Sequence, residues 1–196
     1  MKLVVATKNN GKLLEFKRML EPLGFDVVSQ LDCGVEGQAE ENGTTFEENA
    51  RLKARYVFER TGYITIADDS GLCVDALNGR PGVYSARYGG PGKTDADRVD
   101  LLLDELKDVP DCGRGAYFAC AISVIFPEDE WSIFERCYGV IGHEPKGGHG
   151  FGYDPVFLVD GQSFSEMDDA EKDRISHRGQ ALRELVRRLK DKGDCE

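Results

Sequence analysis

The sequence lacks the features that mark several large classes of protein. Its 196 residues contain no internal repeat, no low-complexity tract and no apolar run of membrane-spanning length. There is also no long run of lysine or arginine, and the formal net charge is −11. Such a balance repels DNA, RNA and anionic membranes, so binding to a nucleic-acid polymer or to a membrane is disfavoured. Binding of a small anionic ligand remains compatible with this net charge, because a few lysines gathered in a cleft can reverse the local electrostatic potential.

Cysteine is present without the spacing that would give it a structural role. No C-x-x-C pair occurs among the six cysteines, which stand at positions 33, 73, 112, 120, 137 and 195. The chain opens on the strand-like KLVVAT instead of a charged leader, so we expect reduced thiols in the cytoplasm. Zinc bound by Cys137, His143 and His149 is disfavoured, because their spacing matches no usual ligand pattern.

What is present fits a globular α/β protein. Hydrophobic residues make up 40% of the chain and charged residues 31%, and a chain of this length can bury about 70% of its unfolded surface. We therefore expect one α/β domain over residues 1–196. Strands are predicted at 2–7, 25–30, 63–67 and 156–159, a hairpin at 116–126 and 131–141, and helices from about 13 to 23, at 44–62, from 94 and from about 176. Helices combined with a hairpin predict a mixed sheet.

The first candidate site is ATKNNGK, residues 6–12, between the first strand and the first helix. It offers backbone N–H groups, a helix N-terminus and the side chains of Lys8 and Lys12 to an anion. Ala6 and Leu13 stand where a Walker A loop needs glycine and Ser/Thr, so the segment is not a P-loop. On composition alone, a solvated turn and a phosphate site are about equally compatible with it.

The second candidate is the pair Asp68 and Asp69 after the strand TIA, considered together with Glu40 and Glu41. Two unpaired carboxylates about 4 Å apart repel by roughly 4 kcal/mol at an effective dielectric constant of 20, so a shared site calls for a cation. Mg²⁺ prefers such hard oxygen ligands and bridges carboxylates to phosphates. Because side chains alternate along a strand, only one aspartate is expected to face the site. Asp69 is the better candidate because Ser70 and Gly71 open the loop beside it; the alternative is a strand-end pair that points to water.

Two further segments carry weaker signals. FGYDP, residues 151–155, follows a glycine-rich stretch and sets aromatic rings beside an aspartate, which suits stacking on a planar base but is also common in a core. EKDRISHRGQAL, residues 171–182, gathers Lys172, His177 and Arg178 at a helix start. This cluster can equally be a basic surface beside a helix that Ser176 caps.

Taken in order along the chain, these motifs resemble the inosine triphosphate pyrophosphatase family, also called the Ham1-like family. ATKNNGK, GTTFEENARLKAR, ADDSGLCVDALNGRPGVYSARYGG, GFGYDP and ISHRGQAL are similar to its motifs and cover nearly all of the sequence. The resemblance implies an elongated mixed sheet flanked by helices, two lobes with a central active-site cleft, and a homodimer.

The resemblance also implies roles for individual residues. It assigns Mg²⁺ binding to Glu41 and Asp69, and proton acceptance to Asp69. Substrate contacts are implied for Thr7, Lys8, Asn9, Asn10, Gly11, Lys12, Lys53, Ser70, Phe151, Gly152, Tyr153, Asp154, Lys172, His177 and Arg178. Lys8 departs from the family pattern, which often has a small residue at that position.

The implied reaction is attack of water on the α-phosphorus of ITP, dITP or XTP, which yields the monophosphate and pyrophosphate. A Lys or Arg donor suits the C6 carbonyl of these bases and opposes the amino group of adenine. Two other functions fit the same residues: a nucleotide sensor without turnover, and a related pyrophosphatase acting on dTTP or UTP.

Overall fold

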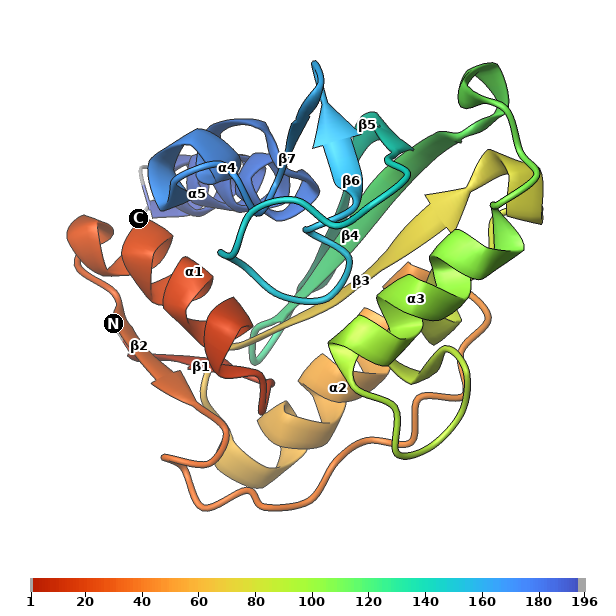
Figure 1. Ribbon diagram of the computed structural model, residues 1–196. Coiled ribbons are helices and arrows are strands. Elements are labelled where there is room, and N and C mark those ends of the chain that lie inside the picture. The colour runs from red at the N-terminus through yellow and green to blue at the C-terminus, as the bar shows by residue number, and fades with distance from the viewer. Residues whose placement is uncertain (1, 194–196) are drawn as a thin grey trace. The chain divides into compact units, whose positions relative to one another are not determined.

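The computed structural model describes residues 2–193, which fold into seven strands and five α-helices (Figure 1). The strands are β1 (Lys2–Val5), β2 (Asp26–Ser29), β3 (Thr65–Val74), β4 (Gly115–Ile125), β5 (Glu130–Ile141), β6 (Phe157–Val159) and β7 (Gln162–Ser163). The α-helices are α1 (Asn10–Leu20), α2 (Phe46–Thr61), α3 (Asp95–Glu105), α4 (Asp169–Ile175) and α5 (His177–Gly193). Four short 3-10 helices occur at Glu21–Leu23, Asp75–Leu77, Gly82–Arg87 and Asp111–Gly113.

The strands form one seven-stranded sheet in the order β2-β1-β3-β4-β5-β6-β7. β1 is parallel to β2 and β3, whereas β6 is antiparallel to β5 and β7. β4 and β5 are neighbours joined by a tight turn in which the Phe126 N–H donates to the Asp129 carbonyl at 2.8 Å. The predicted mixed sheet with a hairpin is therefore confirmed.

The helices begin where the sequence supplies caps. Thr45 with Glu48, and Thr94 with Asp97, form capping boxes at the starts of α2 and α3. α2 ends at Gly62, whose φ of 68° lies in the left-handed region that glycine tolerates. Both helix starts agree with the sequence prediction.

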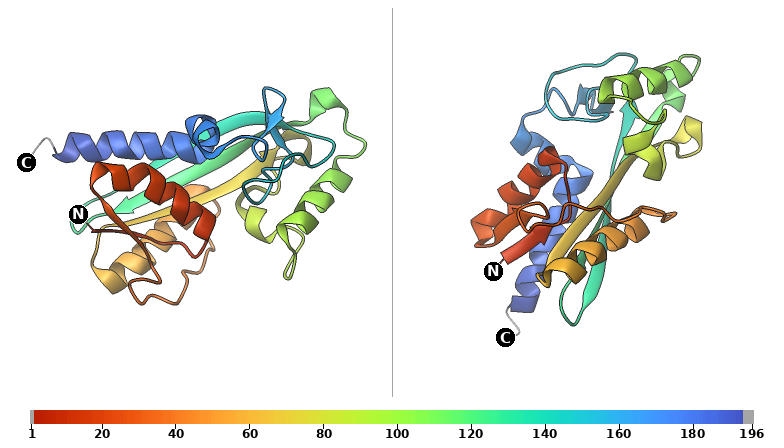
Figure 2. Two further views of the ribbon diagram at one scale, coloured as in Figure 1. Left: turned by 60° about the vertical axis from the view of Figure 1, so that its left-hand side comes forward. Right: turned by 90° about the horizontal axis from the view of Figure 1, so that it is seen from below.

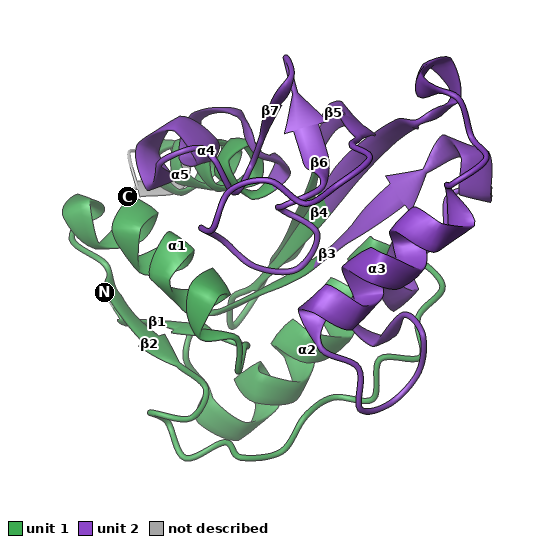
Figure 3. Ribbon diagram, in the orientation of Figure 1, with its two compact units in different colours: residues 1–69, 120–135, 178–196 green, residues 70–119, 136–177 purple. Residues whose placement is uncertain are grey.

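Residues 2–193 divide into two compact units, which Figure 3 shows in different colours. Unit 1 comprises residues up to 69, 120–135 and from 178 onward, and unit 2 comprises residues 70–119 and 136–177. That residues 1–196 form a single domain stays a prediction.

No helix within residues 2–193 is both long and apolar enough to cross a membrane. The five cysteines in this range form no disulfide with one another, and Cys195 lies outside it.

Unit 1 has a core on each side of its strands, and the pleat decides which residue joins which core. Leu3, Val5 and Ile66 pack with residues of α1 and α5, while their neighbours Val4 and Ala67 pack with residues of α2. Figure 2 shows α1 and α5 on one side of β3 and α2 on the other. The alternation of side chains along a strand thus gives each face of β3 its own partners.

Unit 2 has a single apolar core built on the second half of β3. Leu72 and Val74 pack there with Phe118 of β4, Phe157 of β6 and Leu102 of α3. The rings of Phe118 and Phe157 meet edge to face with centroids 4.7 Å apart. This core supports the chain on either side of the FGYDP segment.

One expectation about elements was wrong, and one short helix and one short strand were not predicted. β3 does not end at residue 67 but continues to Val74, so both aspartates, Ser70 and Gly71 lie within a strand. Charged and small residues resemble a loop in sequence, yet here basic partners from other segments allow buried carboxylates to remain in the strand. The predicted final helix is α5, which starts at His177 as expected, but the helix α4 before it was not predicted; Ser176 ends α4 with an extended ψ of 155°. The short strand β7 was not predicted.

Candidate active site

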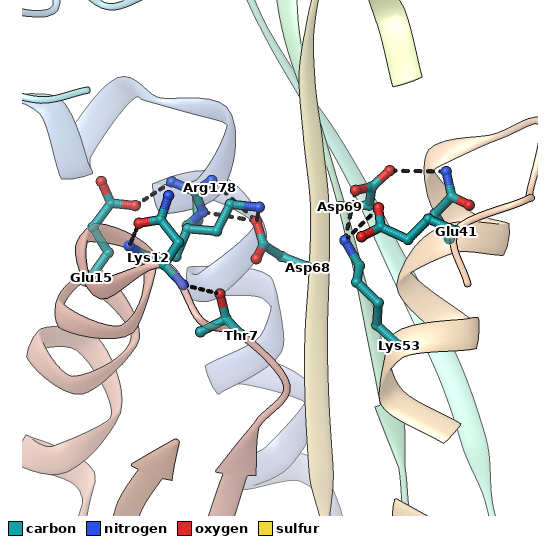
Figure 4. A network of polar contacts seen from close by, with 10 residues as sticks. Thr7, Lys12, Glu15, Glu41, Lys53, Asp68, Asp69 and Arg178 are labelled. Carbon is teal, nitrogen blue, oxygen red and sulfur yellow. Dashed lines mark hydrogen bonds and ion pairs between the residues drawn. The ribbon is translucent and has the colours of Figure 1, made fainter. Parts of the chain in front are cut away.

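Asp68 and Asp69 point to opposite sides of β3, as Figure 4 shows. Asp68 continues the side of Ile66 toward α1 and α5, and Asp69 continues the side of Ala67 toward α2. Both aspartates are buried, with 2% and 7% of their surface exposed. The alternation predicted from the sequence is therefore present, and it gives two adjacent carboxylates separate surroundings.

Asp68 belongs to a buried ion-pair network. Its Oδ2 lies 3.0 Å from Lys12 Nζ and 3.1 Å from both Nε and Nη2 of Arg178. The remaining guanidinium nitrogen of Arg178, Nη1, contacts the buried carboxylate of Glu15. The network therefore joins the start of α1, the middle of β3 and the start of α5.

The charges in this network support one another. Burial alone would raise the pKa of Asp68, but Lys12 and Arg178 outweigh it and hold that pKa well below its ordinary value. Burial acts to lower the pKa of Arg178, and Asp68 and Glu15 raise it instead. The two cations thus favour the ionised form of Asp68.

Asp69 has a different set of partners, all from the other side of β3. Its Oδ1 accepts from Lys53 Nζ at 2.7 Å, and its Oδ2 accepts from Asn49 Nδ2 at 3.4 Å. Asn49 and Lys53 lie one turn apart on α2, so one helix face presents both. Lys53 Nζ also lies 3.5 Å from Glu41 Oε2, so Glu41 and Asp69 converge on a single cationic atom.

The pKa of Asp69 shifts in the direction opposite to that of Asp68. Burial raises it, and the opposing effect of Lys53 does not cancel the increase. For Lys53, burial acts to lower the pKa, but the charges of Asp69, Asp68 and Glu41 together raise it. Lys53 is therefore a fixed positive charge between two carboxylates.

The turn before α1 is organised by its own side chains. Asn9 is the N-cap of α1 and its Oδ1 accepts from the Lys12 N–H at 3.1 Å. The Asn9 N–H in turn donates to Thr7 Oγ1 at 3.1 Å. Lys8 and Asn10 are exposed, and Gly11 is half-buried in the first turn of α1. Of the predicted residues in this turn, Lys12 is the one that the structure joins to an aspartate of β3.

In unit 2, the segment from Phe151 to Asp154 is held by several polar contacts. The buried Asp154 Oδ2 accepts from the Phe151 N–H at 2.9 Å and from Lys172 Nζ at 2.7 Å. The Tyr153 hydroxyl donates to the Ser85 carbonyl at 3.0 Å. A Cβ on Gly150 would lie 2.2 Å from Asp154 Oδ2, so only glycine allows this close approach.

Phe151 and Gly152 also line a pocket of about 350 Å³ at the start of α3. Lys172 Nζ lies 4.9 Å from the centroid of the Phe151 ring, so a cation and an aromatic face stand together. The buried ring of His177 stacks on Phe118 with centroids 4.7 Å apart. Phe151, Gly152, Asp154 and Lys172 therefore form a second group of predicted site residues.

Sequence reasoning missed Glu15 and Asn49. Glu15 lies one turn after Lys12, and a glutamate inside the apolar face of Phe16 and Leu20 could have indicated a buried ion pair. Asn49 is completely buried and precedes Lys53 by one turn, which is an unusual position for an amide on an apolar helix face. Ser70 is half-buried within β3, so its predicted substrate contact stays a prediction.

The residues present fit a divalent cation at Glu41 and Asp69. Both supply hard carboxylate oxygens, and both already face the ammonium group of Lys53, so their common surroundings accommodate positive charge. Within the described part of the chain, no three His, Cys, Asp or Glu side chains gather around one metal position. Two carboxylates with further oxygens from a phosphate are a usual arrangement for Mg²⁺.

Known proteins show the same fold and motifs. The model of the Ham1 family matches residues 3–188. A protein of Bacillus licheniformis named dITP/XTP pyrophosphatase is 51% identical over 185 residues, which cover 93% of this chain and 94% of that protein. The structure of a HAM1 protein from Coxiella burnetii has a TM-score of 0.89 at 40% identity and covers 97% of this chain and 99% of its own. A Mycobacterium abscessus structure titled nucleoside-triphosphatase / dITP/XTP pyrophosphatase has a TM-score of 0.76 at 44% identity, with 96% and 100% covered.

Proposed function

Because the chain belongs to the Ham1 family, we propose that it is a hydrolase that converts ITP, dITP and XTP into the monophosphate and pyrophosphate. Relatives that carry the name dITP/XTP pyrophosphatase match almost its whole length. Removing these non-canonical nucleotides from the nucleotide pool is the cellular role that follows from this activity.

The observation that carries the proposal is the convergence of Glu41 and Asp69 on Lys53. A protein that only binds a highly charged anion gains little from placing two carboxylates in its site. Carboxylates become useful when a divalent cation sits between them and the phosphates. This argument favours turnover over a sensor that binds nucleotide without reaction.

We assign the phosphate chemistry to residues of unit 1. Bound Mg²⁺ would neutralise charge on the triphosphate and polarise it for attack. Lys12 and Lys53 would bind the phosphates, and Asp69 would orient the attacking water and accept its proton. Glu41 and Asp69 would hold the metal, while the exposed turn from Thr7 to Gly11 would offer N–H groups and side chains to the phosphates.

We assign base selection chiefly to residues of unit 2. Phe151 offers a ring face for stacking, and Lys172 is a donor for the C6 carbonyl that hypoxanthine and xanthine carry. Adenine has an amino group there, and leaving a buried polar group unpaired costs on the order of 1 to 3 kcal/mol. The three guanidinium nitrogens of Arg178 contact Asp68 and Glu15. A contact between Arg178 and the base therefore stays a prediction.

We also propose that the protein works in the cytoplasm as a homodimer. Neither point is tested by the geometry of one chain. Light scattering on the purified protein checks the second, because a dimer has twice the 21.7 kDa mass of the chain.

Pyrophosphate release from ITP, dITP, XTP, GTP, ATP, dTTP and UTP, each with Mg²⁺ and with excess EDTA, tests the proposed function. We expect ITP, dITP and XTP to exceed ATP in kcat/KM by about 100-fold, since discrimination through an unpaired polar group can reach 10⁴. EDTA should abolish release and added Mg²⁺ restore it.

Other outcomes of the same assay assign other functions. Binding of ITP without any product would indicate a sensor, and preferred hydrolysis of dTTP or UTP would indicate a pyrophosphatase with a different base pocket. Undiminished release in EDTA would remove the metal from the proposal.

A further inference from the structure

The base-selecting segment contains glycines whose backbone needs an external anchor. Gly147, Gly150 and Gly152 all have positive φ, with 62° at Gly152. Glycine has the widest conformational freedom of any residue, so contacts must select one conformation of this segment. Phe151 and Asp154 are fixed by each other, and Tyr153 is fixed by Ser85. Gly152 has no side chain with which to make a contact of its own.

The Gly152 backbone is anchored by Asp95, the first residue of α3. The Gly152 N–H donates to Asp95 Oδ2 at 2.9 Å, across 57 positions of sequence. Arg98 Nη1 lies 3.1 Å from the other carboxylate oxygen, Oδ1, and the Arg98 side chain is only 14% exposed. The buried arginine thus orients the carboxylate, and the carboxylate orients the peptide group of Gly152.

The helix itself does not require this carboxylate as a cap. Thr94 and Asp97 already form the capping box of α3, with reciprocal bonds between side chain and backbone. Asp95 also lies beside Phe151 and Gly152 in the lining of the 350 Å³ pocket. Its position is therefore explained by the loop that it contacts more than by the helix on which it lies.

We propose that Asp95 is a positioning residue for base selection, acting through the peptide group of Gly152. The Gly152 N–H belongs to the peptide group that joins Phe151 to Gly152. By accepting a hydrogen bond from this N–H, Asp95 sets the direction in which the backbone continues after Phe151. Without the contact, the peptide group of Gly152 can rotate, and the bond between Phe151 and Asp154 is left to orient the ring toward the base without support from Asp95. The inference rests on the proposed function, since it names a further residue that determines its specificity.

Two substitutions separate the hydrogen bond from the negative charge. Asp95→Ala removes the acceptor, whereas Asp95→Asn keeps an oxygen acceptor for Gly152 and loses the charge. Asp104→Ala is the matched control, because Asp104 is an acidic residue nine positions further along α3 with 70% of its side chain exposed. All three variants are compared with the wild-type protein for melting temperature, amide hydrogen exchange and kinetics.

The expected results differ between the variants. Asp95→Ala should speed exchange of the Gly152 amide about tenfold, in line with the loss of one charge-assisted hydrogen bond. It should also lower the ratio of kcat/KM for dITP over ATP by roughly tenfold, mainly through KM, at an unchanged melting temperature. Asp95→Asn should recover most of both effects, and Asp104→Ala should resemble wild type.

Each contrary result has a distinct meaning. Wild-type exchange at Gly152 in Asp95→Ala would overturn the anchor itself. Faster exchange with an unchanged dITP-to-ATP ratio would overturn the role in specificity and leave only a structural contact. If the wild-type protein hydrolysed neither nucleotide, the proposed function would fail and the role in specificity with it, whereas the exchange measurement would still decide whether Asp95 holds the loop.

Discussion

Asp69→Asn is expected to reduce kcat for dITP by about 10² to 10⁴, the usual contribution of a positioned general base. The substitution keeps the shape of the side chain and leaves Lys53 in contact with Glu41. It removes the carboxylate that we assign to both metal binding and proton acceptance. Steady-state hydrolysis of dITP with saturating Mg²⁺ measures the effect, and the melting temperature shows whether the fold is retained.

A surface aspartate provides the control for this prediction. Asp104 lies on α3 with 70% of its side chain exposed, so Asp104→Asn should leave kcat unchanged. Turnover of Asp69→Asn within a few fold of wild type would remove Asp69 from the mechanism. A collapse of the melting temperature in this variant would instead show that its carboxylate is needed mainly for folding.

Arg178→Ala is expected to have the largest effect on stability. It leaves the buried Asp68 paired with Lys12 and removes the cation that contacts the buried Glu15. Breaking a buried ion pair by deleting one partner costs about 3 to 5 kcal/mol. For a chain of this size that corresponds to a melting temperature lower by roughly 10 °C. Thermal unfolding followed by circular dichroism measures the shift.

The same variant tests the predicted base contact of Arg178. If its guanidinium also reaches the base, the preference for ITP over ATP should narrow, and an unchanged ratio would refute that assignment. Arg187→Ala on the same helix is the control, because Arg187 is 61% exposed and surface ion pairs contribute about 0 to 1 kcal/mol. A melting temperature of Arg178→Ala equal to that of Arg187→Ala would contradict the buried network.

Much of the site follows from rules that act locally along the chain. The alternation of side chains in a strand separates Asp68 from Asp69, and capping residues fix the starts of α2 and α3. These are short-range effects that the sequence displays directly. The family resemblance added the roles of the motifs, which periodicity alone does not provide.

The parts that sequence reasoning missed depend on partners far away in the chain. The continuation of β3 past Asp69 requires Arg178 and Lys53 to neutralise its charges, and Arg178 lies 110 positions from Asp68. The contact of Asp95 with Gly152 likewise spans 57 positions. No local pattern marks such pairs, because either residue alone resembles an ordinary surface charge or a flexible glycine.

The central claim is that water attacks the α-phosphorus of dITP beside the carboxylates of Glu41 and Asp69. Its most direct test is the position of oxygen-18 after a single turnover of dITP with Mg²⁺ in labelled water. We predict one labelled oxygen in the nucleoside monophosphate and none in pyrophosphate, both measured by mass spectrometry. Label in pyrophosphate, or release of labelled orthophosphate in its place, would contradict the account.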